Sequence, residues 1–332
     1  MNDPGASAAI RILCSPATAA ELRPRMPQAG VRGSYTFVHP SPETPHPDAD
    51  IGFVSRDITG ASTKFDVKPD TALYYEALRH TPHLQWVHIH SAGLDRPIYL
   101  DLQARGVTVT NSAGHNARSV AQMALGGVLA LSRKLPAFMA AQRDARWLPP
   151  YEQSPPRDLD GQVAVIVGWG GIGQHIARVL QALEVRVRVA RHDATRDAEG
   201  ADITVAYGAV NTLLSDADWL ILACPISDAT HRLIDADALA RLPAHAHLIN
   251  VSRGTVVDEA ALIDALTHRR LAGAYLDVFE REPLPADSPL WRLDNVIATP
   301  HSSGHSSGNR ERVLQMFLRE LARREADGLL RK

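Results

Sequence analysis

The chain has 332 residues, of which 45% are hydrophobic and 22% are charged, and its formal net charge at pH 7 is −2. Its length is enough for about two domains with buried cores, and its composition excludes a disordered or fibrous protein. The near-neutral charge argues against a nucleic acid or a membrane surface as the main partner, and no apolar run is long enough to span a membrane.

The first third of the chain alternates apolar and polar segments. Its short apolar runs are typical of strands, and their alternation with polar stretches predicts a parallel α/β sheet. The expected strands are 10–14, 51–54, 84–89 and 107–110, with a proline-rich loop at 40–47. The third strand ends at the turn Ser91-Ala92-Gly93, and the fourth leads into Asn111.

Residues 117–131 have apolar side chains at helical spacing. Gly126 and Gly127 lie inside this predicted helix, where each costs about 1 kcal/mol relative to alanine. That cost indicates close packing against another helix, at a domain or subunit interface. A loop rich in proline follows, up to Pro156.

A glycine-rich motif then follows the apolar run 163–167 and begins a segment of helical periodicity. The motif is Gly168-Trp169-Gly170-Gly171-Ile172-Gly173. In a strand, turn and helix of this kind, the glycines allow a tight turn, close approach of a pyrophosphate and close helix packing, while helix N–H groups meet the anion. We therefore expect a dinucleotide to bind at Gly168, Gly170, Gly171, Ile172 and Gly173.

The next predicted strand, 185–190, ends at Arg191 and His192. An acidic residue about 20 positions after the first glycine accepts a hydrogen bond from the ribose of NAD, whereas an arginine can pair with the 2′-phosphate of NADP. Arg191 therefore favours NADP(H), with NAD(H) possible because a small shift of the turn could bring Asp193 to the ribose.

Further strands are predicted at 219–224, 247–251, 274–278 and 296–299, and an amphipathic helix at 310–326. Polar residues follow three of these strands, and the carboxyl ends of parallel strands face one crevice. They include a guanidinium, Arg253, a carboxylate, Glu282, and an imidazole, His301. These groups supply what the reduction of a carbonyl needs besides a hydride donor.

At this point the chain resembles the D-isomer-specific 2-hydroxyacid dehydrogenase family. The resemblance rests on the ordered set of motifs from Ser91-Ala92-Gly93-Leu94-Asp95 through the glycine motif to His301-Ser302-Ser303-Gly304. It implies two Rossmann-like, doubly wound α/β domains, with a dinucleotide-binding domain at 112–300 inserted into a substrate domain made of 1–111 and 301–332. It also implies a homodimer formed through the inserted domain, with the helix of Gly126 and Gly127 as a candidate contact.

The resemblance implies a role for each polar group. Arg253 would clamp the substrate carboxylate, His301 would protonate the carbonyl oxygen, and Glu282 would orient the imidazole. Glu282 is preferred to Glu280 because the family's glutamate lies five places after the aspartate that corresponds to Asp277. The backbone of Ala92 and Gly93 would hold the substrate carboxylate, and hinge closure would bring it toward Arg253. The remaining expected cofactor contacts are Cys224, Pro225, Thr230, Val251, Ser252, Asp277 and Gly304.

The expected activity is the reduction of a small 2-keto acid, glyoxylate or hydroxypyruvate, with NADPH. The alternatives are a dehydrogenase of the same scaffold for phosphoglycerate, formate or phosphite, and a dinucleotide-sensing protein that recruits a partner. The formate enzymes carry Gln where Glu282 stands, and a phosphorylated substrate would favour extra basic residues that the sequence does not locate.

The histidines and cysteines are expected to have no metal or disulfide role. His301 and His305 have the i, i+4 spacing of a helical zinc pair, and His83, His88 and His90 recur nearby, but a third-ligand motif is not evident. Cys14 and Cys224 lie in apolar stretches, and residues 1–9 do not resemble a signal peptide. We therefore expect a cytoplasmic protein without bound metal.

Overall fold

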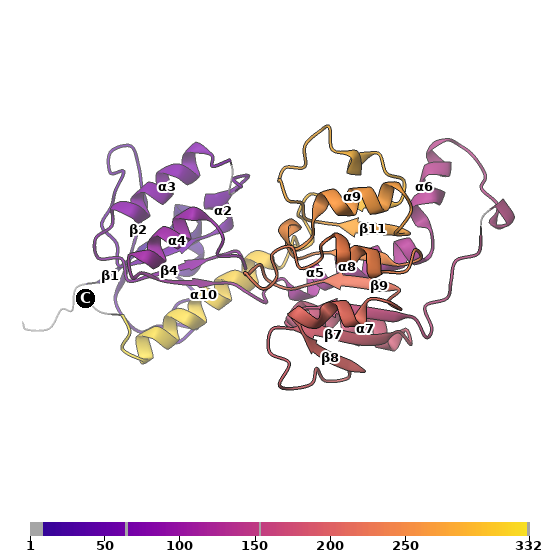
Figure 1. Ribbon diagram of the computed structural model, residues 1–332. Helices are drawn as coiled ribbons and strands as arrows, with labels where there is room; N and C mark the ends of the chain where they lie inside the picture. The colour runs from indigo at the N-terminus through magenta and orange to yellow at the C-terminus, as the bar shows by residue number, and fades with distance from the viewer. Residues whose placement is uncertain (1–8, 64–65, 153, 331–332) are drawn as a thin grey trace, which may run out of the picture. The chain divides into compact units, whose positions relative to one another are not determined.

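The computed structural model describes residues 9–63, 66–152 and 154–330. The chain forms two compact units, Met1–His115 together with Ser306–Lys332, and Asn116–His305. Each unit contains its own parallel sheet, so the chain has the predicted α/β class with two doubly wound domains (Figure 1). The boundary after His305 places His301 in the second unit.

The first unit is built on a five-stranded sheet in the order β2-β1-β3-β4-β5, in which every pair is parallel. Its strands are β1 (Ile10–Leu13), β2 (Tyr35–Val38), β3 (Ile51–Val54), β4 (Trp86–Ile89) and β5 (Thr108–Asn111). Strand β2 was not expected from the sequence, because Tyr35–Val38 is a half-exposed edge strand whose apolar residues are interrupted by Thr36.

Helices cover both faces of this sheet (Figure 1), as the two separate clusters of buried side chains confirm. They are α1 (Pro16–Leu22), α2 (Arg56–Thr59), α3 (Pro69–His80), α4 (Pro97–Ala104) and α10 (Asn309–Ala326). The predicted C-terminal helix is thus present, and its apolar stripe packs on the sheet: Phe317 stacks on Phe53 and Trp86 with ring centroids 4.3 and 5.3 Å apart.

The second unit contains a seven-stranded parallel sheet in the order β12-β11-β10-β9-β6-β7-β8. Its strands are β6 (Val163–Val167), β7 (Arg186–Arg191), β8 (Ile203–Ala206), β9 (Trp219–Leu222), β10 (His247–Asn250), β11 (Gly273–Leu276) and β12 (Val296–Ala298). The order reverses between β6 and β9, and in open parallel sheets ligands bind beyond the strand ends at such a reversal.

Two helical layers enclose this second sheet. The helices are α5 (Ala117–Ser132), α6 (Leu135–Arg143), α7 (Gly171–Ala182), α8 (Ala236–Arg241) and α9 (Glu259–Thr267). Short 3-10 turns occur at Pro150–Glu152, Tyr207–Leu213, Gly254–Val256 and Pro289–Trp291.

The packing of α5 corrects one expectation about its glycines. A Cβ on Gly127 would lie 2.6 Å from the ring of Tyr275, a residue of β11. Gly127 therefore lets α5 lie against the sheet, and its contact is not another helix. A Cβ on Gly126 would meet nothing within 4 Å, so Gly126 has no such packing role inside the unit.

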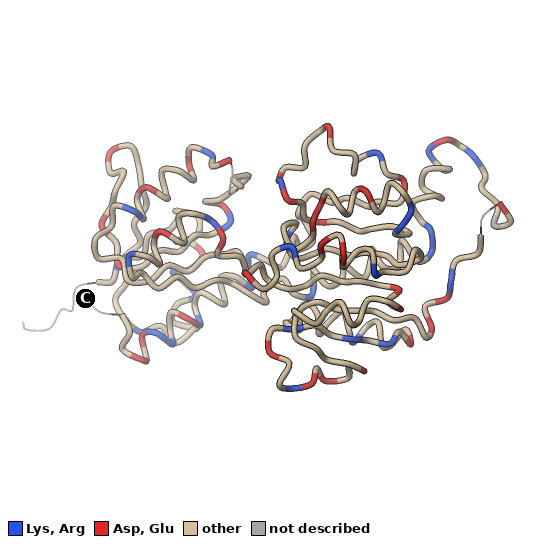
Figure 2. Tube along the Cα trace, viewed as in Figure 1, with Lys and Arg blue, Asp and Glu red and all other residues tan. Residues whose placement is uncertain are grey.

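Acidic and basic residues are interspersed along the chain of each unit (Figure 2). Within the described residues, no single helix is long and apolar enough to cross a membrane. The helices α5 and α6 together meet the requirement of length and composition, but the chain bends by 73° between them.

Candidate active site

The glycine turn between β6 and α7 lies at the reversal of the second sheet. Gly168 has φ of 108°, and a Cβ there would lie 2.7 Å from the backbone of Ala223. A Cβ on Gly173 would lie 2.1 Å from the carbonyl oxygen of Gly168. A Cβ on Gly170 would meet nothing within 4 Å. Gly168 and Gly173 therefore cannot carry a side chain without a clash, while the open space at Gly170 leaves room for a ligand.

The first turn of α7 has the properties of an anion site. Gly170 precedes it as N-cap without a side-chain hydrogen bond, so the N–H groups of the first turn have no capping side chain. A Cβ on Gly171 would touch Ala117 at 3.3 Å, which brings α5 beside this turn. The free donors and the helix dipole fit the pyrophosphate of a dinucleotide.

The pairing of β6 with β7 places Arg191 beside this turn. The N–H of Gly168 donates to the carbonyl of Ala190 at 2.8 Å, and Arg191 is the next residue. His192 is exposed, with its ring 6.4 Å from that of Tyr207. The end of β7 thus presents two basic side chains next to the glycine turn.

Asp193 is held by its own turn. Its Oδ1 accepts hydrogen bonds from the N–H of Thr195 at 2.9 Å and from the Thr195 hydroxyl at 2.6 Å. These bonds, helped by the charges of Arg191 and His192, lower the pKa of Asp193. The carboxylate that could reach a ribose is therefore engaged within its own turn.

The loops after β9 and β10 complete this part of the unit. Cys224, Thr230, Val251 and Ser252 are buried, so their side chains shape the loops. The Thr230 hydroxyl donates to the carbonyl of Pro225 at 2.8 Å, and Pro225 itself is exposed. Burial raises the pKa of Cys224 to about 12, which keeps the thiol protonated.

Arg253 follows β10 in a loop fixed by Asn250. The Asn250 Oδ1 accepts from the backbone and hydroxyl of Ser252 at 3.0 and 2.8 Å, and its Nδ2 donates to the Arg253 carbonyl at 3.1 Å. A Cβ on Gly254 would lie 1.9 Å from the carbonyl carbon of Phe279. The Arg253 loop therefore packs backbone to backbone against the loop of Glu282.

Glu282 and His301 form a hydrogen-bonded pair. Nδ1 of His301 lies 2.7 Å from Oε2 of Glu282, with 47% and 26% of the two side chains exposed. Burial raises the pKa of Glu282, but the bond with His301, its charge, the Phe279 N–H and the charge of Arg253 together bring it below its usual value. The carboxylate is thus ionised and faces an imidazole.

Glu280 lies in a different environment. Its backbone N–H donates to Oε2 of Glu259 at 2.9 Å, and its carboxylate lies 3.7 Å from the guanidinium of Arg232. Glu282 is thus the glutamate of this segment that bonds His301.

Asp277 holds the turn that carries His301. Its carboxylate is buried and accepts hydrogen bonds from Thr299 Oγ1 at 2.6 Å, Ser302 N–H at 2.8 Å and Ser303 N–H at 3.0 Å, and from the Ser303 hydroxyl. Its carbonyl accepts from the His301 N–H at 2.8 Å. His301 has φ of 49°, a conformation that costs about 1–3 kcal/mol in a non-glycine residue. The bonds to Asp277 offset that cost.

The turn after His301 is not helical. His305 donates its N–H to the Ser302 carbonyl at 2.8 Å, and α10 begins only at Asn309, so the helical spacing assumed for a metal pair is wrong. A Cβ on Gly304 would lie 2.5 Å from Nδ2 of Asn116. Among the described residues, no group of three or more His, Cys, Asp and Glu is arranged to hold a metal ion.

In the first unit, the turn after β4 is fixed by Asn111. Its Nδ2 donates to the Ala92 carbonyl at 2.6 Å, and its Oδ1 accepts from the Ala113 N–H at 3.2 Å. The Ser91 hydroxyl donates to the Gly93 carbonyl at 3.1 Å. The carbonyls of this turn point to the protein, and within the described residues the N–H groups of Ala92 and Gly93 donate no backbone hydrogen bond.

His88 and His90 of the first unit have structural partners. His88 is buried between the hydroxyls of Thr110 at 2.8 Å and Ser112 at 3.0 Å. His90 contacts the hydroxyl of Thr59 at 2.9 Å. Burial lowers the pKa of His88 to about 4 and that of His90 to about 3. His83 is exposed.

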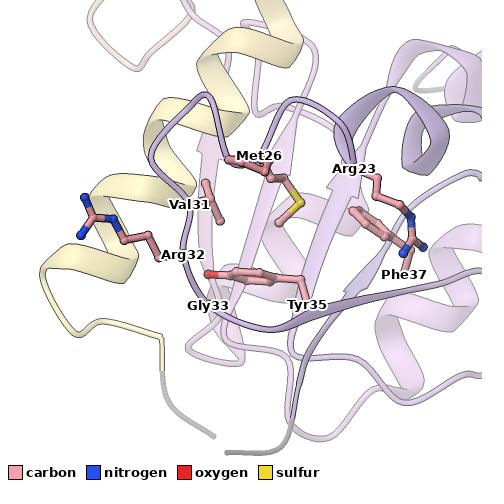
Figure 3. A pocket seen from close by; sticks show the side chains of 8 residues that line it. Arg23, Met26, Val31, Arg32, Gly33, Tyr35 and Phe37 are labelled. Atoms are coloured by element: carbon pink, nitrogen blue, oxygen red, sulfur yellow. The ribbon is translucent and has the colours of Figure 1, made fainter.

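An open hollow of about 490 Å³ also lies in the first unit (Figure 3). Its lining is Arg23, Met26, Pro27, Val31, Arg32, Gly33, Tyr35 and Phe37. The Arg23 guanidinium lies 5.1 Å from the Phe37 ring, and the Tyr35 hydroxyl bonds Glu325 at 3.1 Å. No expected site residue lines this hollow.

Comparison with known proteins agrees with this geometry. The family model for D-isomer specific 2-hydroxyacid dehydrogenases, NAD binding domain, matches residues 125–303. The glyoxylate reductase of Thermofilum pendens is 32% identical over 250 residues, which cover 74% of this chain and 73% of that protein. The chain belongs to the D-isomer-specific 2-hydroxyacid dehydrogenase family. It is therefore an NAD(P)-dependent oxidoreductase.

Two further relatives of this dehydrogenase differ in their named substrates. The (S)-sulfolactate dehydrogenase of Chromohalobacter salexigens is 36% identical over 249 residues, which cover 74% of this chain and 79% of that protein. The NADPH-dependent glyoxylate/hydroxypyruvate reductase of Sinorhizobium meliloti, solved with NADP and malonate, has a TM-score of 0.73 at 27% identity. That alignment covers 97% of this chain and 95% of the other.

Three residues of the dehydrogenase gain a role that the sequence did not assign. Gly254 permits the contact between two active-site loops, Asn111 fixes the Ala92 turn, and Asp277 fixes the His301 turn. The position of Gly254 directly after Arg253 was the available hint in the sequence. Its steric reason depends on Phe279, which lies far along the chain.

Proposed function

We propose that the protein reduces a small 2-keto acid, most readily glyoxylate or hydroxypyruvate, with NADPH. The observation that supports this proposal is the pair formed by His301 and Glu282 at 2.7 Å. Because Nδ1 bonds the carboxylate, Nε2 is the nitrogen left to face a substrate. The names of the Thermofilum and Sinorhizobium relatives support the same class of acid.

Each residue has a chemical task in this proposal. Arg253 binds the substrate carboxylate, because a guanidinium stays charged and offers a planar fork of donors. Nε2 of His301 donates a proton to the carbonyl oxygen, and Glu282 stabilises the charged imidazole beforehand. An acid placed in this way contributes about 10²- to 10⁴-fold in rate. Reduced nicotinamide, when bound, supplies the hydride.

The end of β7 supports the preference for NADPH. Arg191 and His192 lie beside the glycine turn, and the Asp193 carboxylate is engaged by Thr195. An arginine fork can bind a 2′-phosphate, whereas the bonds from Thr195 to Oδ1 hold the Asp193 carboxylate in its own turn. NADH remains a possible but poorer donor. A dinucleotide at the glycine turn would also contact the loops after the neighbouring strands. The contacts proposed there are Cys224, Pro225, Thr230, Val251, Ser252, Asp277 and Gly304.

The units divide the work in this proposal. The unit Asn116–His305 holds the dinucleotide and the catalytic trio, as the match of the NAD-binding model to 125–303 supports. The other unit supplies Ala92 and Gly93, whose N–H groups bind the substrate carboxylate.

We also propose a homodimer formed through the second unit. The segment of α6 and the residues after it extend from this unit (Figure 1) and expose large apolar side chains. Met139, Trp147 and Tyr151 are 62%, 89% and 87% exposed. A second copy would cover them, and a solution mass of one chain would contradict the dimer. A cytoplasmic location also stays a prediction.

Turnover of a panel of 2-keto acids with NADPH and with NADH, followed by the absorbance of the reduced nicotinamide, tests the activity. We expect glyoxylate and hydroxypyruvate to react, and NADPH to be the better donor. Absence of turnover with both cofactors would refute the proposal. For the cofactor preference, Arg191→Asp should lower the NADPH to NADH ratio of kcat/KM, and an unchanged ratio would refute that part alone.

A further inference from the structure

Glu259 is the first residue of α9 and lies half-buried beside the loop that carries Glu282. Burial raises the pKa of Glu259, and the charges of Glu280 and Glu282 add to that rise, while a hydrogen bond from the Glu280 N–H opposes it. A carboxylate near two others is unfavourable for the folded chain, and carboxylates perturbed in this way are concentrated at functional sites. The reaction described above assigns no task to Glu259.

The backbone around Glu259 is anchored to the rest of the second unit. The Asp258 N–H donates to the Ile234 carbonyl at 3.0 Å, next to the parallel bridge between Ile234 and Val257. Asp258 also caps α9, because its Oδ1 accepts from the Ala261 N–H at 3.1 Å. The side chain of Glu259 therefore starts from a fixed point.

Glu259 and Glu282 bind successive N–H groups of one loop. The Glu280 N–H donates to Oε2 of Glu259 at 2.9 Å, and the Phe279 N–H donates to Oε1 of Glu282 at 3.2 Å. The other oxygen of Glu282, Oε2, bonds His301. Glu259 thus holds the residue next to the one that supports the Glu282 carboxylate.

The peptide group between Phe279 and Glu280 is also the point where two active-site loops meet. A Cβ on Gly254 would lie 1.9 Å from the carbonyl carbon of Phe279 and 2.3 Å from the nitrogen of Glu280. This peptide group is therefore packed against the backbone of Gly254 and bonded through its N–H to Glu259. Because Gly254 directly follows Arg253, a movement of this peptide group would shift the Glu282 loop relative to the Arg253 loop.

We propose that Glu259 is a positioning residue for the reduction, whose carboxylate binds the Glu280 N–H and so holds the loops of Arg253 and Glu282 together. This inference rests on the proposed function, in which Glu282 orients the imidazole of the acid. The side chain of Glu280 is not required, because its backbone N–H is the donor. The reverse bond, from the Glu259 N–H to Oε1 of Glu280, is long at 3.5 Å.

Two substitutions of Glu259 separate the hydrogen bond from the charge. Glu259→Gln keeps the length of the side chain and an oxygen that accepts from the Glu280 N–H, but it removes the charge. Glu259→Asp keeps the charge, but its side chain is one methylene group too short to reach that N–H. The order of activities therefore tells which property matters.

Steady-state kinetics of the full-length protein with NADPH and its best 2-keto acid measure this order. We expect Glu259→Gln to keep most of kcat and Glu259→Asp to lower kcat by about tenfold or more, because a small misplacement of a catalytic group costs up to about 100-fold in rate. The KM for NADPH should stay unchanged in both variants, since the glycine turn lies on another loop.

Asp237→Ala is the matched control for the loss of an acidic side chain from the first turn of a helix. Asp237 is exposed in the first turn of α8 (Ala236–Arg241), in the same unit. Its removal weakens the interaction with the helix dipole but does not touch the Glu282 loop. We expect kcat to stay unchanged, and a fall equal to that of Glu259→Asp would overturn the proposal.

Hydrogen exchange of residues 277–282, measured without substrate, gives a readout that does not depend on turnover. Glu259→Asp should speed the exchange of the Glu280 N–H, whereas Glu259→Gln should leave it protected. Exchange that Glu259→Asp leaves unchanged would overturn the proposed bond. Faster exchange at an unchanged kcat would overturn the positioning role.

The remaining outcomes separate this inference from the proposed function. Equal losses of kcat in Glu259→Gln and Glu259→Asp would assign the effect to charge and overturn the role of the hydrogen bond, while the proposed reduction would stand. Absence of turnover by the unaltered protein with every 2-keto acid would refute the proposed reduction and the role of Glu259 in it, and hydrogen exchange would still show whether Glu259 holds the loop.

Discussion

Nδ1 of His301 binds Oε2 of Glu282 across 2.7 Å, although the two residues lie on loops that follow different strands. Asp277 reinforces this pairing, because its carbonyl accepts from the His301 N–H and its carboxylate accepts from the N–H groups of Ser302 and Ser303. His301, the acid of the proposed reaction, is thus positioned by two acidic residues. Glu282 bonds its imidazole ring, and Asp277 bonds the backbone of its turn.

Replacing Glu282 should separate its role from that of Glu280. Glu282→Gln keeps the size of the side chain but removes the charge that stabilises the protonated imidazole, so kcat should fall on the order of 100-fold. Glu280→Gln is the matched control, because Glu280 faces Glu259 and Arg232. Steady-state kinetics of both variants decide the matter. Equal losses would contradict the assignment.

Asp277→Asn should release the His301 turn. The amide places a donor where the carboxylate accepts from Ser302 and Ser303, and leaving buried donors unpaired costs about 1–3 kcal/mol. We expect a lower unfolding free energy in urea, together with a loss of kcat at saturating substrate. An active variant with reduced stability would show that Asp277 does not position His301.

Two glycine substitutions should have opposite effects. Gly254→Ala places a methyl group 1.9 Å from the carbonyl carbon of Phe279, so the Arg253 loop must move and activity should be lost. Gly126→Ala adds a methyl group where nothing lies within 4 Å, and should stabilise α5 by up to about 1 kcal/mol. Thermal unfolding and kinetics measure both. Dissociation of a dimer by Gly126→Ala would instead place Gly126 at the subunit interface.

Thr195→Val should weaken the preference for NADPH. The substitution removes the hydroxyl that bonds Asp193 at 2.6 Å and so frees the carboxylate for a ribose hydroxyl. The kcat/KM ratio of NADPH to NADH should fall by about two- to tenfold, the value of one hydrogen bond. Thr212→Val, at an exposed hydroxyl in the same unit that bonds the Ala209 carbonyl, is the control and should leave the ratio as it is.

Stability should fall in mild acid because three histidines, His88, His90 and His247, are buried or half-buried. Burial lowers the pKa of His88 and His247 from 6.5 to about 4 and that of His90 to about 3. The unfolded chain therefore binds more protons below pH 6.5. The free energy of unfolding is therefore not reduced by these histidines above pH 6.5, their pKa in the unfolded chain. It falls as the pH drops from there toward their pKa values in the folded protein.

Each histidine that stays neutral should contribute a slope of about 1.4 kcal/mol per pH unit between these limits. Urea unfolding between pH 4.5 and pH 7 measures the slope, and His88→Gln should reduce it. His268→Gln is the control, since His268 is exposed on the surface. A slope that His88→Gln leaves unchanged would show that His88 is already charged in the folded protein.

The sequence determined the elements whose signal is local. Apolar runs gave the central strands, and spaced glycines gave the turn before α7, because a buried parallel strand and a left-handed turn each restrict the residues at their own positions. The edge strands β2 and β8 (Ile203–Ala206) were not predicted, because a half-exposed strand does not need a run of apolar residues.

The tertiary structure decided which of the polar residues meet. The sequence pattern favoured Glu282, but only the loop geometry shows it at His301 while Glu280 turns to Glu259. Such contacts join residues far apart along the chain, and their distances follow from strand order and loop packing, which no local residue pattern encodes.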